Sequence, residues 1–124
     1  MNFNNFTIKS QEAIQQAQLL AQSMQHQQIE NEHIFKAITQ VEENVIPFLL
    51  KKLGLNFTLI QQILDKEMLT FPKVDGGDIM LSKEAAKTLN EASIIAKKME
   101  DEGHRILKLN IGNPAPFGFD TPED

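Results

Sequence analysis

Four residues in the first third of the chain have side chains that could bind a metal ion. They are His26, Glu30, Glu32 and His33, which lie close together in the sequence. Imidazole nitrogens and carboxylate oxygens are common zinc ligands. Glu32 and His33 are adjacent on a predicted helix, however, and such side chains point about 100° apart, which is a poor arrangement for holding one ion. We therefore interpret the cluster as capping and packing residues and expect no metal site.

Two acidic stretches are the other candidates for chemistry. Residues 75–78, Asp-Gly-Gly-Asp, have the composition of a phosphate or calcium loop. They lack the lysine of a P-loop and the ligand count of an EF-hand, so we interpret them as an exposed linker. Asp101 and Glu102 lie at the predicted end of a helix, where the helix dipole disfavours negative charge. Such a pair is most often solvated, but its unfavourable position also leaves a functional role open.

The composition argues against several classes of protein. The chain has 124 residues, of which 41% are hydrophobic, which is enough for one domain with a core. It has no cysteine, so disulfides, thiolate catalysis and cysteine-ligated metals are excluded. A net charge of -5 argues against nucleic acid or an anionic membrane as the main partner. Because no apolar run approaches the roughly 18 residues of a membrane span and the N-terminus does not resemble a signal peptide, we expect a soluble, cytoplasmic protein.

An internal repeat organises the chain. Residues 10–24 align without a gap to residues 85–99, so that Ile14 is matched by Leu89. The matched apolar positions recur at spacings of three and four and therefore share one face of a helix. Two copies of a helical unit are expected to pack against each other, because one copy rarely buries its own apolar face. We expect the stripe of residues 85–99 to pack on the first helix, and the correspondence ends after Glu102.

Capping residues and apolar spacing predict five helices. Their expected N-caps or first residues are Thr7, Asn31, Asn44, Asn56 and Ser82, whose side chains can accept a backbone N–H of the first helical turn. The chain then divides into a first helical repeat, a linker, the start of a second repeat and an irregular tail, over residues 1–72, 73–81, 82–102 and 103–124. Within the tail, residues 106–111 alternate in part between apolar and polar side chains and are predicted to be extended. The prolines that follow cannot continue a helix.

These residues resemble a known family. The opening, MNFNNFTIKSQEAIQQAQLLAQSMQHQQIENEHIFKAI, resembles that of the Clp N-terminal (Clp repeat) domain of ClpB-type AAA+ disaggregases. Residues 29–33, Ile-Glu-Asn-Glu-His, are similar to the family's Ile-Glu-Pro-Glu-His motif. Residues 71–78 resemble the family's inter-repeat linker, and Leu81 with Ser82 its second-repeat start. The resemblance covers residues 1–102.

The resemblance implies a fold and a function. The fold is an all-α, Clp N-terminal-like helical repeat domain, with the first four-helix repeat complete and the second truncated after its first helix. The function is a non-catalytic one: the domain recognises exposed apolar segments of unfolded or aggregated polypeptides for the AAA+ ATPase domains of a hexamer. The resemblance also implies substrate-binding residues, because Thr7 matches a threonine used in handling aggregates, Leu89 and Ile95 match groove leucines, and Asp101 matches a functional acid. Thr7 can serve as an N-cap and as a contact at once.

The tail has a different resemblance. Residues 103–119, GHRILKLNIGNPAPFGF, are similar to a segment near the N-terminus of alanine-type, fold-type I aminotransferases, where an acidic helix likewise precedes Leu-Asn-Ile-Gly-Asn-Pro. This suggests a chimera or a gene fragment. The chain contains neither ATPase motifs nor the aminotransferase's cofactor lysine, so we expect no enzymatic activity and no cofactor. Phe117 and Phe119 either dock on the apolar surface left open by the incomplete second repeat or stay disordered.

Two alternatives to the chaperone module stay open. One is a stand-alone adaptor that docks a Clp protease or disaggregase, and the other is an inactive fragment of a pyridoxal-phosphate aminotransferase fusion. We also expect the apolar stripe of residues 85–99 to be partly uncovered. Such a surface favours partner binding, domain swapping or aggregation.

Overall fold

The computed structural model describes residues 6–109, with residues 104–109 described by their backbone alone. These residues belong to two compact units, one ending at Leu89 and one beginning at Asn90. The elements in chain order are α1 (Ile8–Ser23), β1 (Gln28–Ile29), α2 (Asn31–Val41), α3 (Val45–Lys52), α4 (Phe57–Met68), β2 (Met80–Leu81) and α5 (Lys83–Leu109). The fold is therefore helical, and α5 continues from the first unit into the second.

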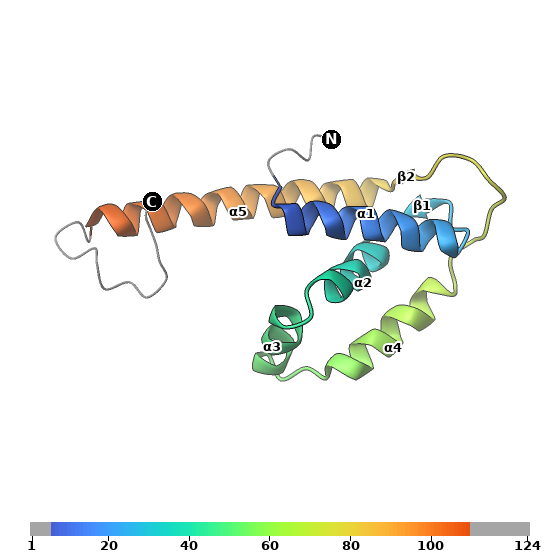
Figure 1. Ribbon diagram of the computed structural model, residues 1–124, viewed down its shortest axis with the longest axis horizontal. Helices are drawn as coiled ribbons and strands as arrows, with labels where there is room; N and C mark the ends of the chain where they lie inside the picture. Colours follow the sequence, from blue (N-terminus) through green and yellow to red (C-terminus); the bar gives the residue numbers. More distant parts are fainter. Residues whose placement is uncertain (1–5, 110–124) are drawn as a thin grey trace. The chain divides into compact units, whose positions relative to one another are not determined.

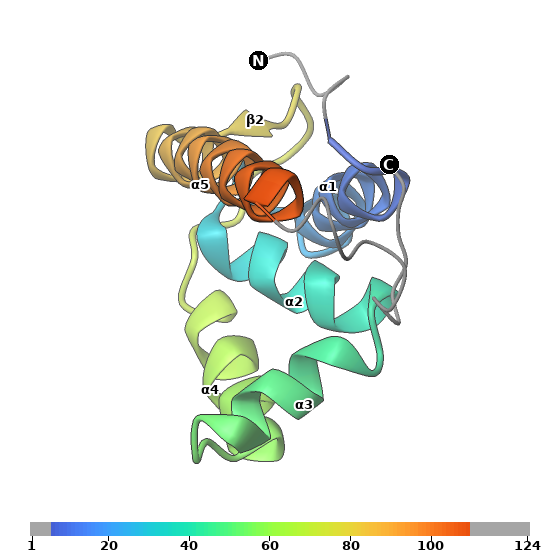
Figure 2. The same ribbon diagram turned by 90° about the vertical axis from the view of Figure 1, so that its left-hand side faces the viewer.

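The core of the first unit lies between α1 and α2. Ala13, Ala17 and Ala21 recur every four residues along α1 and are at most 4% exposed. Small side chains in such a row let two helix backbones approach closely, and α2 contributes Ile34 and Ala37 to the same core. Figures 1 and 2 show α1, α2 and the α3–α4 pair as successive layers of this unit.

The linker after α4 returns to the start of α2. Val74 donates its backbone N–H to the Gln25 carbonyl (2.8 Å), and His26 forms an antiparallel bridge with Lys73. Further along, β2 pairs in parallel with β1, with Met80 opposite Gln28 and Leu81 opposite Ile29. These bonds place the first turns of α5 against the core, where Ala85 and Leu89 are buried.

Most of the predicted helix starts are confirmed. Thr7 Oγ1 accepts from the Ser10 N–H (3.1 Å) and Asn56 Oδ1 from the Leu59 N–H (3.0 Å). Ser82 Oγ accepts from the Ala85 N–H (3.0 Å). Asn44 precedes α3 as expected, but the Glu42 carboxylate accepts the N–H groups there. The prediction that Asn31 caps α2 is wrong, because Glu30 is the N-cap and Asn31 is the first helical residue.

The predicted change of structure at residue 103 is also wrong. Helix α5 continues through Gly103 to Leu109, so residues 106–109 are helical and not extended. Leucine, isoleucine and lysine are adequate helix formers, and a single glycine costs a helix only about 1 kcal/mol. Partial alternation over so few residues could not outweigh an established helix. The proline-containing stretch with Phe117 and Phe119 lies outside the described residues.

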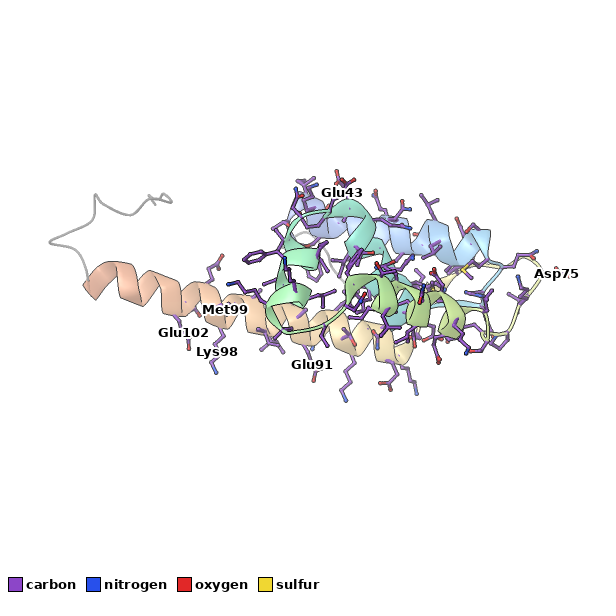
Figure 3. All side chains as sticks on the ribbon, turned by 90° about the horizontal axis from the view of Figure 1, so that it is seen from below. Glu43, Asp75, Glu91, Lys98, Met99 and Glu102 are labelled. Atoms are coloured by element: carbon purple, nitrogen blue, oxygen red, sulfur yellow. The ribbon has the colours of Figure 1, made fainter. Side chains whose placement is uncertain are left out.

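The part of α5 from Asn90 onward belongs to the second unit. Its large apolar side chains Ile94, Ile95 and Met99 are 57–65% exposed. Figure 3 shows four labelled side chains that extend from this part of α5, those of Glu91, Lys98, Met99 and Glu102. The apolar stripe of residues 85–99 is thus buried at Ala85 and Leu89 and exposed toward its C-terminal end. None of the described helices is long and apolar enough to cross a membrane.

Candidate functional site: an apolar pocket beside a buried histidine pair

Two buried histidines connect the start of α2 to the linker. His26 and His33 are at most 2% exposed, and Nδ1 of His26 lies 2.7 Å from Nε2 of His33. Phe71 packs edge-on against both rings, with centroid distances of 5.2 and 5.6 Å. The sequence-based interpretation of these residues as capping and packing groups is confirmed for His33, whose Nδ1 accepts the Glu30 N–H at the start of α2 (2.8 Å).

The hydrogen bonds of the pair assign the tautomers. Because Nδ1 of His33 accepts from the Glu30 N–H, the neutral ring carries its proton on Nε2, which donates to Nδ1 of His26. His26 then carries its own proton on Nε2, a buried atom with no hydrogen-bond partner in the part of the chain that the structure describes. In both rings Nδ1 is the only acceptor nitrogen, and it already accepts a hydrogen bond. Adding a proton to either Nδ1 would therefore break that ring's hydrogen bond.

The surroundings of the pair favour the neutral rings. Burial, followed by the neighbouring His26, lowers the pKa of His33 from 6.5 to about 4. Burial also lowers the pKa of His26, as does the positive charge of Lys73, while the carboxylate of Glu30 acts in the opposite direction. Because Nδ1 of His26 and Nδ1 of His33 both already accept hydrogen bonds, the pair is suited to holding the linker in place and has no free acceptor nitrogen for a metal.

An open pocket of about 460 Å³ lies on the other side of α2. Its apolar walls come from α2 and α4, with Thr88 contributed by the first turns of α5. The lining residues are Asn31, Glu32, Ile34, Phe35, Ile38, Leu64 and Thr88. All belong to the first unit, so one folded body forms the whole pocket.

Polar side chains beside the pocket hold its two helices together. Lys36 of α2 forms a salt bridge to Asp65 of α4 (2.9 Å) and donates to Gln61, which ties together the two helices that line the pocket. Asn31 also lines the pocket, but its Oδ1 is buried and has no hydrogen-bond partner among the described residues. The remaining polar lining residues are Glu32 and Thr88, and the other walls are apolar, which suits an apolar chain segment.

None of the four residues predicted from the family resemblance is among those that line this pocket. Thr7 is exposed at the N-terminus of α1, and Leu89 is only 6% exposed and packs in the core, directly after the pocket residue Thr88. Ile95 and Asp101 belong to the second unit, where Ile95 is exposed and Asp101 lies 3.9 Å from Lys97. Their role in substrate binding stays a prediction.

One pattern in the sequence points to this pocket. At 100° per residue, Ile34, Phe35, Ala37 and Ile38 of α2 form one apolar arc of about 160°, which is wider than the roughly 100° stripe that faces a core. Ile34 and Ala37 fill the core, whereas Phe35 is only half-buried and lines the pocket. An apolar arc wider than the core contact indicates a second contact surface beside the core.

Comparison with known proteins identifies the family. A family model described as the Clp repeat (R) N-terminal domain matches residues 5–104, so the chain belongs to this family. It is 47% identical over 102 residues to the chaperone protein ClpB of Bacteroides thetaiotaomicron and 42% identical over 102 residues to that of Porphyromonas gingivalis. Each match covers 82% of this chain and 12% of the relative, so the chain spans about an eighth of the length of these chaperones.

A second, shorter match concerns a different protein. Over 29 residues the chain is 69% identical to the glutamate-pyruvate aminotransferase AlaA of Escherichia coli, which covers 23% of this chain and 7% of that enzyme. The matched shares of 82% and 23% together exceed the whole chain, so the chaperone and aminotransferase matches overlap. A 29-residue match that includes residues 103–119 begins before residue 103, and since the chain ends at residue 124 its first residue lies within α5. Both resemblances derived from the sequence are thereby confirmed.

Proposed function

We propose that this chain recognises exposed apolar segments of unfolded or aggregated polypeptides for a ClpB-type ATP-dependent disaggregase. The open apolar pocket on α2 and α4 is the observation that carries the proposal. Membership of the Clp repeat family and the similarity to ClpB chaperones support it. The domain acts by binding alone, and the AAA+ ATPase domains of a hexamer are its partners.

The pocket suits one or two apolar side chains of a client. Its volume of about 460 Å³ lies within the range of sites that hold a small ligand. Burying one large apolar side chain of the client in the pocket contributes roughly 1.5–3 kcal/mol. With so few anchors, the expected affinity is weak, with a Kd on the order of 0.1 mM. Weak binding is compatible with a site that must release its client.

The residues transferred from the family have distinct roles in the proposal. Thr7 and Asp101 would contact the client directly, and Ile95 would add an exposed apolar contact. Leu89 would act from the core, because its buried side chain fixes the turn of α5 that presents Thr88 to the pocket.

A binding titration with matched variants tests the proposal. Dye-labelled casein, which is unfolded, is titrated with the 124-residue chain and with its Phe35→Ser and Leu19→Ser variants, and fluorescence anisotropy is recorded. Phe35 lines the pocket, whereas Leu19 is a 58% exposed apolar residue of α1 that does not. We expect Phe35→Ser to weaken binding at least tenfold and Leu19→Ser to leave it unchanged.

The outcomes separate the functional alternatives. Equal loss in both variants would show unspecific apolar adhesion and would contradict a pocket-based site. Absence of casein binding combined with binding to an AAA+ hexamer would favour the adaptor alternative.

A further inference from the structure

Helices α3 and α4 form the outer layer of the first unit and expose an unusual number of apolar side chains. Val45, Phe48 and Leu49 of α3 and its C-cap residue Leu53 are 47–72% exposed. The spacing of the three helical residues places them along one side of the helix. Leu55, Leu59 and Ile63 continue this exposure into the loop and α4. Figure 3 views the molecule from the side on which α3 and α4 lie, opposite to α1 in Figures 1 and 2. We call these seven residues the α3–α4 face.

The α3–α4 face is separate from the pocket and large enough for an interface. None of its residues lines the pocket. At about half exposure, its one phenylalanine and six aliphatic side chains present on the order of 500 Å² of apolar surface. Two such faces would bury roughly 1,000 Å², which reaches the minimum expected of a specific protein interface. Apolar surfaces of this size on a folded unit indicate a binding site.

The charges at the two ends of α3 indicate the partner. Glu42 and Glu43 precede the helix, and Lys51 and Lys52 form its last turn. If two α3 helices pair in antiparallel orientation about a two-fold axis near Phe48, the acidic end of each lies opposite the basic end of the other. The opposed helix dipoles favour the same orientation. An extended apolar segment of a client would leave both charged ends unmatched.

We propose that the α3–α4 face binds the same face of a second copy of this chain, forming a two-fold symmetric dimer. The interface is isologous, so each contact occurs twice, with Phe48 near the axis and the charged ends of α3 paired across it. Interfaces at this lower size limit form weak or transient complexes, so we expect a dissociation constant in the micromolar range. The dimer leaves the pocket on α2 and α4 outside the interface and does not depend on client binding.

Sedimentation equilibrium with apolar variants tests the location of the interface. The 124-residue chain is compared with its Phe48→Ser and Leu53→Ser variants, and with Leu19→Ser, an exposed apolar residue of α1, as a matched control. We expect a monomer–dimer equilibrium that either α3 variant weakens at least tenfold and the control leaves unchanged. Circular dichroism and thermal unfolding establish that each variant is folded, which is expected because the replaced side chains are about half exposed or more.

A charge exchange tests the antiparallel pairing independently of apolar packing. Glu43→Lys and Lys52→Glu place like charges across the two-fold axis in their own homodimers, and each alone should weaken association. Glu43 is chosen because the Glu42 carboxylate accepts the N–H groups of Asn44 and Val45 and is needed for the start of α3. An equimolar mixture of the two variants restores both opposite-charge pairs, so association should recover in the mixture.

Three results would overturn the proposal. The first is a wild-type chain that stays monomeric up to about 0.5 mM, well above the expected micromolar dissociation constant. The second is a dimer that Ile95→Ser disrupts and Phe48→Ser does not, since that places the interface on α5. The third is a mixture of the two charge variants that associates no better than either variant alone.

Discussion

Protonation of the buried histidine pair is expected to destabilise the first unit as the pH falls. The pKa of His33 is about 4 in the folded chain and 6.5 when the ring is free. Above pH 6.5 both states are neutral and the full stability is present. Between pH 6.5 and 4 the unfolded chain binds a proton that the folded chain excludes, so the free energy of unfolding falls. The difference corresponds to about 3 kcal/mol, a large fraction of the stability of a small domain.

The geometry explains why the folded chain excludes the proton. A proton on Nδ1 of His33 would face the Glu30 N–H, and a proton on Nδ1 of His26 would face the Nε2–H of His33. Both acceptor sites are occupied, so either protonation breaks a buried hydrogen bond. The linker then loses support, because Phe71 packs on both rings and His26 bridges Lys73.

Urea unfolding at 25 °C, followed by circular dichroism at pH 7, 6, 5 and 4.5, measures this effect. The variant His33→Gln can still accept the Glu30 N–H but does not titrate, so its stability should be lower at pH 7 and much flatter toward pH 4.5. The control is Glu42→Gln. Backbone hydrogen bonds from Val45 and Asn44 lower the pKa of Glu42, so this variant changes the profile only near and below pH 4.5. A wild-type free energy of unfolding that stays constant from pH 7 to 4.5 would refute the reasoning.

Three further predictions concern the elements that position the pocket. Leu89→Ala should lower the free energy of unfolding by about 2–5 kcal/mol, because it opens a cavity in the core. Ile95→Ala, at an exposed position, should change the free energy of unfolding by less than about 0.5 kcal/mol. Urea unfolding of the two variants measures the difference. Ser82→Ala should cost about 1 kcal/mol and increase amide hydrogen exchange in the first turn of α5, because its hydroxyl caps that helix. Gly54→Ala should cost about 1 kcal/mol in thermal unfolding, because Gly54 ends α3 with a φ of 77°.

Local signals predicted most of the helical architecture. Thr7, Asn56 and Ser82 cap the helices they were expected to cap, because capping depends on one side chain and a backbone group three residues away. The packing of Ala85 and Leu89 against the core followed from the internal repeat. The start of α2 was misplaced by one residue because the reciprocal bond between Glu30 and His33 replaces an asparagine cap, and histidine is not the usual residue in that role.

Features that depend on tertiary contacts could not be predicted. The pocket requires α4 to lie beside α2, and the Lys36–Asp65 pair that ties them is far apart in the sequence. The edge-on packing of Phe71 against two histidines likewise depends on the path of the linker. Helix α5 is longer than the sequence predicts, because Gly103 does not end it. The overlap of the chaperone and aminotransferase matches is consistent with a helix that continues through it.

Mapping of a bound client by nuclear magnetic resonance tests the central claim most directly. The claim is that the pocket on α2 and α4 receives an apolar segment of an unfolded polypeptide. When unlabelled unfolded casein is added to the ¹⁵N-labelled chain, the largest shifts of backbone amides should occur at residues 31–38, Leu64 and Thr88. Shifts confined to residues 45–63 or to residues 90–102, with those pocket amides unchanged, would contradict it.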